Sequence, residues 1–139
     1  MTYEWPLYIC LFLALWRAMQ NIIRDVIRTQ FVAGIISIAI FALVFALYSL
    51  AVFEGAALAA LVLAAVVYCP TVFLVTVLGN VPMNNRLESL DQRSENARIY
   101  WEEYGRKWTR LNHYRSIGSV LTAGLYIIAA ITLITSGQV

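Results

Sequence analysis

The chain has 139 residues, which is room for a single domain over 1–139. Hydrophobic residues make up 61% of it and charged residues only 13%, whereas soluble domains carry about 25% charged residues. A water-soluble fold of this size could not bury so much apolar surface, so the composition predicts an all-α integral membrane protein in a lipid bilayer. The net charge is +2 and basic residues are interleaved with acidic ones, so no nucleic-acid partner is expected.

The N-terminal region, residues 6–29, changes character along its length. Pro6 to Trp16 is an uncharged apolar run of 11 residues, too short to cross a bilayer alone because a span needs about 20 residues. The polar residues that follow recur at helical spacing, which places on one stripe Arg17, Asn21, Arg24 and Arg28. We therefore expect a short first helix that is partly embedded at its start and amphipathic at its end.

Three further segments are long enough to span the bilayer as helices, residues 31–53, 55–77 and 117–135. Only Glu54 and Gly55 lie at the junction of the first two, which predicts a tight antiparallel hairpin. The second span has small residues at a spacing that lets a neighbouring helix approach closely: Ala56, Ala60 and Ala64. With the short first helix, these spans predict a four-helix bundle.

The distribution of Lys and Arg predicts the orientation. All ten lie in two segments, three in residues 17–28 and seven in residues 86–115. Three spans put both segments on one side of the membrane, and the positive-inside rule makes that side cytoplasmic. The polar segment 79–115 is therefore expected in the cytoplasm and the C-terminus outside.

The polar segment is expected to begin with a turn and continue as a helix. Residues 79–86 are rich in proline and asparagine, which is typical of a turn that leaves the membrane. Ser94 is a suitable N-cap, and Glu95 after it suits the start of a helix dipole. The spacing predicts an interfacial helix that runs from Glu95 into the last span.

That helix divides into two faces at 100° per residue. The aromatic face carries Ala97, Tyr100, Trp101, Tyr104, Trp108, Leu111, Asn112 and Arg115. The charged face carries Arg98, Glu102, Glu103, Arg106, Arg110 and His113. The aromatic set is also what an interfacial aromatic belt requires, and Arg115 is placed to reach lipid phosphates. Asn112 and Arg115 approach the membrane on the packed face, so they are better candidates for a pocket than the lone histidine.

Metal and nucleophile chemistry has no support in the sequence. Cys10 and Cys69 lie in apolar runs without a second Cys or a His nearby, which is typical of buried small hydrophobes. A single histidine is a poor basis for haem or a metal site, so no metal is expected.

Two blocks resemble a known family. They are residues 80–87, Asn-Val-Pro-Met-Asn-Asn-Arg-Leu, followed by Asp91, and the set Trp101, Tyr104, Trp108, Asn112, His113 and Arg115. Together with residues 18–23, Ala-Met-Gln-Asn-Ile-Ile, this pattern resembles the anthrone oxygenase-like family of small membrane proteins over about residues 15–135. The resemblance implies a four-helix membrane bundle whose characterised members oxidise anthrones to anthraquinones with dioxygen and no cofactor. The family's first span is full length, whereas the apolar run here is cut short before Pro6.

The resemblance also implies a set of site residues. Substrate binding is carried over to Gln20, Asn80, Asn84, Arg86, Trp101 and Trp108, and catalytic roles to His113, Asp91, Asn112 and Arg115. His113 or Asp91 would remove an acidic C–H proton, and the Asn and Arg side chains would hold the resulting oxyanion. The aromatic face would stack on a flat lipophilic substrate.

Two functions remain open from the sequence. The first is cofactor-independent oxidation of a lipophilic aromatic compound. The second is a non-catalytic role as a small structural or accessory membrane subunit, as a homo-oligomer or in a larger membrane complex. A transporter is disfavoured because the spans contain no ionisable residue that would couple to an ion.

Overall fold

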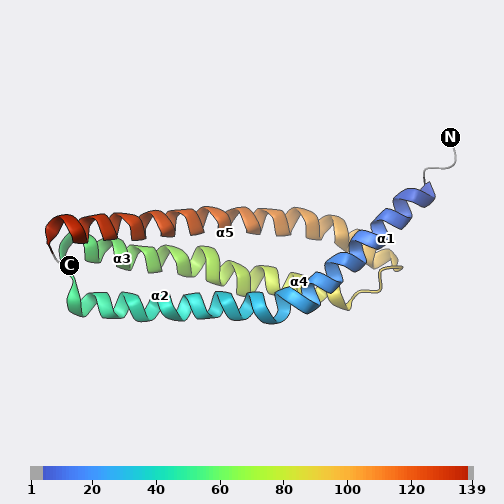
Figure 1. Ribbon diagram of the computed structural model, residues 1–139. Helices are drawn as coiled ribbons and strands as arrows, with labels where there is room; N and C mark the ends of the chain where they lie inside the picture. Colours follow the sequence, from blue (N-terminus) through green and yellow to red (C-terminus); the bar gives the residue numbers. More distant parts are fainter. Residues whose placement is uncertain (1–4, 138–139) are drawn as a thin grey trace.

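The protein is all-α over residues 5–137, the part of the chain that the computed structural model describes; the side chains of residues 5–6 and 27–29 lie outside the described set. Figure 1 shows the elements, which are α1 (Trp5–Ile22), η1 (Ile23–Phe31), α2 (Val32–Val52), α3 (Gly55–Tyr68), η2 (Cys69–Asn80), α4 (Val81–Ser89) and α5 (Glu95–Ser136). The segments η1 and η2 are π-helical and join the α-helices on either side of them into longer rods. The predicted all-α class is confirmed, with α1 as the short first helix.

Helix α2, the rod made of α3, η2 and α4, and helix α5 lie side by side, and α1 leans away from them at one end (Figure 1). Within residues 5–137, three helices are long and apolar enough to cross a membrane, Val32–Val52, Gly55–Ser89 and Glu95–Ser136. The 21 uncharged residues of α2 extend about 31 Å, which matches a hydrocarbon core. The chain is therefore a multi-pass membrane protein, as its composition predicted.

The hairpin between α2 and α3 turns on a glycine. Phe53 and Glu54 are extended, and Gly55 has a φ of +63°, a conformation that side chains with a Cβ rarely adopt. The small residues of α3 then pack on α5 as well as on α2, with Ala60 and Leu61 against Ala129. The buried alanines of α3 are Ala57, Ala60 and Ala64, whereas Ala56 of the predicted set is exposed.

A second close approach joins η2 to α5 through Gly118. A Cβ placed on Gly118 would lie 2.0 Å from Oγ1 of Thr71, so only glycine fits at this crossing. Small residues thus let α5 approach both α3 and η2. Because α5 is one continuous helix, these contacts also fix the position of its polar first half relative to the apolar spans.

The turn predicted at residues 79–86 is wrong, because the second rod stays helical as far as Ser89. The N–H of Val81 bonds to the carbonyl of Thr76 in a π-type step, and Pro82 lies directly after it in the first turn of α4. A wide turn leaves room for a proline ring that would clash in a regular α-turn. Asn80 and Asn84 consequently face the interior of the bundle, and both are buried.

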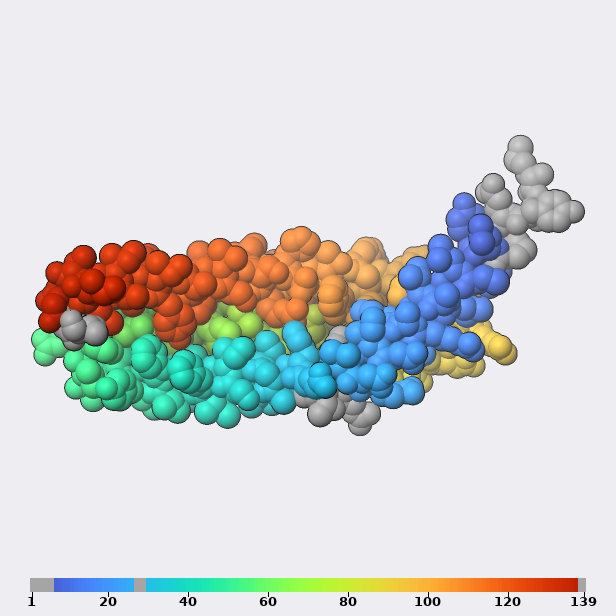
Figure 2. All heavy atoms as spheres, viewed as in Figure 1, coloured from blue at the N-terminus to red at the C-terminus, as the bar shows by residue number. Residues whose placement is uncertain are grey.

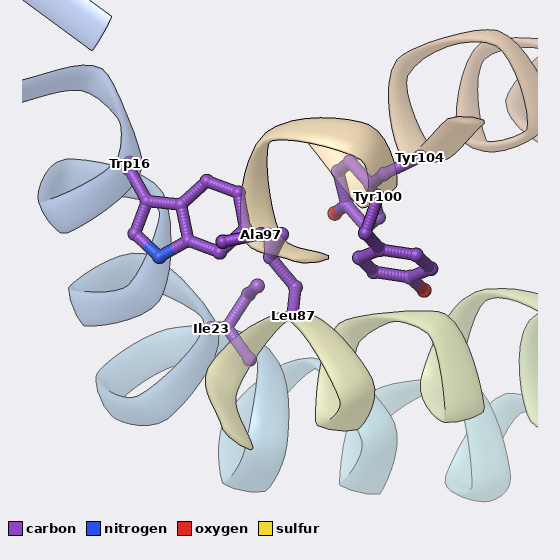
Figure 3. Packing of buried hydrophobic residues seen from close by; sticks show 6 residues of the cluster. All are labelled: Trp16, Ile23, Leu87, Ala97, Tyr100 and Tyr104. Carbon is purple, nitrogen blue, oxygen red and sulfur yellow. The ribbon is translucent and has the colours of Figure 1, made fainter. Parts of the chain in front are cut away.

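The short helix α1 docks on the polar end of the bundle. Figure 3 shows Trp16 next to Ala97 of α5 and Ile23 of η1 next to Leu87 of α4, with Tyr100 and Tyr104 of α5 beyond them; all six belong to one buried cluster. Side-chain bonds add to this apolar contact. Arg17 donates to Oε1 of Gln92 (3.2 Å), and Arg24 pairs with Glu88 (3.4 Å). The Arg28 side chain of the predicted stripe falls outside the described set.

Both basic segments therefore lie at the same end of the molecule, here called the basic end. It comprises α1, η1, α4 and the first half of α5. Ser94 caps α5 as predicted, since its Oγ accepts from the N–H of Ala97 at 3.1 Å.

Candidate functional site

The two predicted faces of α5 are present at the basic end. Every residue assigned to the aromatic face is buried or half-buried, and the charged face is exposed apart from the half-buried Glu103. Tyr104 stacks on Trp101 on one side (6.2 Å between ring centroids) and on Trp108 on the other (6.4 Å). The aromatic face thus forms a continuous wall that ends at Trp108.

A cavity of about 100 Å³ opens at the end of this wall, where η1, η2, α4 and α5 meet. Its lining residues are Phe31, Thr76, Asn80, Val81, Asn84, Trp108 and Arg115. Four of these, namely Asn80, Asn84, Trp108 and Arg115, are site residues that the sequence predicted. The structure thus brings these four side chains together in one hollow beneath the basic end, which we call the polar cavity.

Asn84 is fixed in the polar cavity by a tyrosine. The Tyr104 hydroxyl donates to Oδ1 of Asn84 at 2.8 Å, and both side chains are buried. Burial first, and the neighbouring Tyr100 second, raise the pKa of the Tyr104 phenol above its ordinary value. Tyr104 therefore stays a neutral donor at physiological pH, and the bond leaves the Nδ2 hydrogens of Asn84 as the donors available to a ligand.

Asn80 is fixed in a similar way by Trp108. In the amide orientation that satisfies both ends of the side chain, Nδ2 of Asn80 donates to the carbonyl of Val75 at 3.3 Å. Its Oδ1 then accepts from the indole Nε1 of Trp108 at 3.2 Å. This bond orients the indole of Trp108, which lines the cavity together with Arg115.

Arg115 brings a positive charge to the cavity. Its Nη2 donates to Oδ1 of Asn112 at 2.6 Å, and its guanidinium carbon lies 5.0 Å from the ring centroid of Phe31. The ion pairs that the structure shows among described residues join other side chains, so Arg115 has a neutral amide and an aromatic face as partners instead of a carboxylate. A half-buried cation without a counter-charge favours an anionic ligand.

Two predicted catalytic residues lie away from the polar cavity. His113 is exposed, and its Nδ1 lies 2.7 Å from the carbonyl oxygen of Thr109, one turn back on the same helix. Asp91 is exposed in the connection between α4 and α5, where its carboxylate accepts from the N–H of Arg93 at 3.1 Å. Among the described residues that line the cavity, none is acidic and none is histidine.

Three predicted binding residues connect helices to one another. Nε2 of Gln20 reaches the carbonyl oxygens of Leu87, Glu88 and Leu90, at 3.2, 3.3 and 3.2 Å, and so closes the C-terminal end of α4. Arg86 lies over the ring of Tyr100 (4.4 Å), and Trp101 packs on Trp16 (5.2 Å). Their roles in the structure are helix capping and helix docking.

Two lining residues, Phe31 and Thr76, are not among the predicted site residues. They fall within the predicted spans 31–53 and 55–77. The signal for Thr76 is its spacing, because Thr76, Asn80 and Asn84 follow one another at i, i+4 and i+8 and therefore share a helix face. The residues that the structure describes hold no group of three His, Cys, Asp or Glu side chains arranged for a metal ion.

Comparison with known proteins gives a family match that covers the whole polar cavity. A family model described as anthrone oxygenase matches residues 16–125, which include every lining residue of the polar cavity. Searches of curated proteins and of solved structures found no significant match to the chain.

Proposed function

Because the chain belongs to the anthrone oxygenase family, we propose that it oxidises a flat, lipophilic hydroxyaromatic ketone of the anthrone type in the polar cavity. The observation that carries the proposal is the half-buried Arg115, which has no carboxylate partner among the described residues and shares a cavity with Asn80 and Asn84. A cation and fixed amide donors in one small hollow favour a ligand in its oxyanion form.

The first chemical step is the formation of that oxyanion. An anthrone carries a methylene group whose proton is acidic, because the charge left behind spreads onto the ketone oxygen. A guanidinium and an amide N–H beside this oxygen lower the pKa of the bound ligand. Arg115 and Nδ2 of Asn84 are the donors, and Asn112 positions Arg115. The proton passes to solvent, since no described lining residue is a base in the neutral range.

The anion then reacts with dioxygen. It gives one electron to O₂ and the two radicals combine, which forms a C–O bond and, after proton uptake, a hydroperoxide on the former methylene carbon. Loss of the remaining C–H proton and cleavage of the O–O bond leave a ketone. One oxygen atom of O₂ enters the quinone and the other leaves as water, so the step needs no further reductant.

An aromatic side chain near the polar cavity also suits a flat substrate whose oxygen-bearing edge enters the cavity. The indole of Trp108 in the cavity lining offers a flat apolar face for stacking.

We place the basic end on the cytoplasmic side and the C-terminus outside, because all Lys and Arg residues lie at that end.

An accessory, non-catalytic role is the second candidate. It is favoured by the helix-joining contacts of Gln20, Arg86 and Trp101, which give three residues of the family pattern a structural purpose. In that case the protein would bind no anthrone and consume no oxygen.

Oxygen uptake separates the two candidates. Protein in lipid nanodiscs is mixed with a hydroxyanthrone, and O₂ consumption is recorded together with quinone absorbance. We expect turnover by the wild type and a decrease in kcat/KM of about 100-fold for Arg115→Gln. Arg110→Gln removes the same charge from the exposed face of the same helix and should behave like the wild type. No uptake by the wild type, or equal losses in both variants, would contradict the proposal.

A further inference from the structure

The polar cavity is too small for the substrate proposed above. Its volume of about 100 Å³ compares with the roughly 300–1,000 Å³ of pockets that enclose drug-sized ligands. It can hold the oxygen-bearing edge of a fused-ring compound but not the rest of it. The apolar remainder needs a second space next to the cavity.

Such a space lies deeper along the same two rods. An apolar groove of about 260 Å³ is lined from α2 by Ile36, Ala39, Ile40, Ala42 and Leu43, and from α3 and η2 by Ala65, Tyr68, Cys69 and Phe73. We call it the α2 groove. It begins about one turn from the polar cavity, since Phe73 precedes Thr76 on one wall and Ile36 follows Phe31 on the other.

The wall of the α2 groove formed by α2 has few side chains buried inside the bundle. Ala42 and Ser49 are the buried residues of α2, which has 21 residues, whereas the 14 residues of α3 include five buried ones. In Figure 2, α2 and α5 form the near face of the bundle, and α3 is visible in the seam between them. A helix with few buried contacts can move aside at low cost, so α2 is the wall through which a molecule dissolved in the bilayer would pass.

We propose that the substrate has an extended apolar body that lies in the α2 groove, and that it reaches the polar cavity from the lipid along this groove. This inference rests on the function proposed above and adds to it the substrate class and its route. The chemistry that would be recognised is a membrane-partitioned amphiphile with an oxyanion at one end. The occupant follows from continuity along η2, where Phe73 lines the α2 groove and Thr76, three residues further on, lines the polar cavity.

The α2 groove is expected to orient the substrate and to add little affinity. A carbon chain that moves from lipid into an apolar protein groove gains no hydrophobic free energy, because both surroundings are apolar. What the groove fixes is direction, with the oxyanion towards Arg115 and the apolar body towards Ala65.

Photocrosslinking tests this placement without relying on turnover. The probe is a hydroxyanthrone with an alkyl diazirine on the ring farthest from the hydroxyl, bound to protein in nanodiscs and mapped by mass spectrometry. A chain-free hydroxyanthrone serves as competitor, and the absorbance of its enolate reports binding in the polar cavity. We expect crosslinks in residues 36–43 and 65–73 that the competitor suppresses.

One variant and one matched control sharpen the test. Ala65→Phe fills the deep end of the groove and should lower the crosslinking yield about tenfold, with binding of the chain-free compound nearly unchanged. Ala59→Phe makes the same change on the exposed side of α3 and should leave the yield unchanged. Crosslinks outside the groove, or equal yields in both variants, would overturn the inference while the proposed function stands. If neither compound binds, the proposed function itself fails.

Discussion

Asn84 depends on Tyr104 at the scale of single residues. The Tyr104 hydroxyl is the donor that holds Oδ1 of Asn84, and burial keeps this phenol neutral by raising its pKa. Without the hydroxyl, a buried amide oxygen loses its partner and the Asn84 side chain can turn.

We predict that Tyr104→Phe lowers the free energy of unfolding by about 1–2 kcal/mol. Combining it with Asn84→Ala should cost less than the sum of the two single changes, because both remove the same bond. Unfolding by SDS titration in detergent micelles measures both values. Strict additivity would show that the bond contributes nothing.

The exposed histidine provides a test of the proton pathway. His113 bonds to its own helix and does not line the polar cavity, so a substrate proton would have to cross α5 to reach it. We therefore predict that His113→Ala keeps kcat within about twofold of the wild type and leaves the pH profile unchanged. A loss of the rising acidic limb in a pH–rate measurement would instead identify His113 as the base.

At the residue scale, the helical periodicity of α5 predicted which side chains are packed better than it predicted which of them have a chemical role. The helical wheel correctly put Trp108 and Arg115 on the packed face of α5 and His113 on the solvated one. It could not tell which polar residues face a cavity and which cap a helix, because Gln20 and Asn84 are both amide residues that precede a second amide in the sequence. That distinction depends on the docking of α1, which brings residues 67 or more positions apart into contact.

At the scale of elements, one amide side chain of α1 adds hydrogen bonds to the apolar contact between α1 and α4. Nε2 of Gln20 lies within 3.3 Å of three carbonyl oxygens at the C-terminal end of α4. These carbonyls have no partner within their own helix, so Gln20 satisfies groups that α4 cannot.

We predict that Gln20→Ala destabilises the protein by about 1–3 kcal/mol and loosens the connection between α4 and α5. Limited proteolysis at residues 90–94 should accelerate, and the unfolding midpoint should fall. Asn21→Ala, an exposed neighbour on α1, is the matched control. Identical behaviour of the two variants would show that the contacts of Gln20 do not hold α4.

Element boundaries were predictable where composition changes sharply and not where proline suggests a break. The uncharged run of α2 and the Ser94 cap of α5 were found correctly because apolar length and capping chemistry are local signals. Pro82 suggested a turn, but the π-type step before it accommodates the ring. The spacing of Thr76, Asn80 and Asn84 at i, i+4 and i+8 is the sequence signal that the helix continues past Pro82.

At the scale of the whole molecule, the apolar surface and the clustered charge lead to one orientation. Large side chains such as Phe41, Leu78 and Ile134 are about 70% exposed, as expected where lipid is the solvent. All Lys and Arg residues lie in residues 17–28 and 86–115, whereas the turn at Glu54 and the second half of α5 carry none. This distribution follows from the sequence alone, and it is why the membrane class was predictable.

We predict that the turn between α2 and α3 is outside the cell and the basic end inside. In a Cys10→Ala, Cys69→Ala background, Glu54→Cys should react with a membrane-impermeant maleimide on intact cells. Asn96→Cys, exposed on α5, should react only after lysis. The reverse labelling pattern would invert the proposed orientation.

The proposal that Arg115 stabilises a substrate oxyanion is tested most directly by titrating a bound hydroxyanthrone. Its enolate has its own absorbance, so the pH at which it forms can be read in nanodiscs with and without protein. The wild type should bind the enolate at a lower pH than that at which the free compound ionises, and Arg115→Gln should abolish this difference while Arg110→Gln keeps it. An unchanged titration in the presence of the wild-type protein would contradict the central role of Arg115.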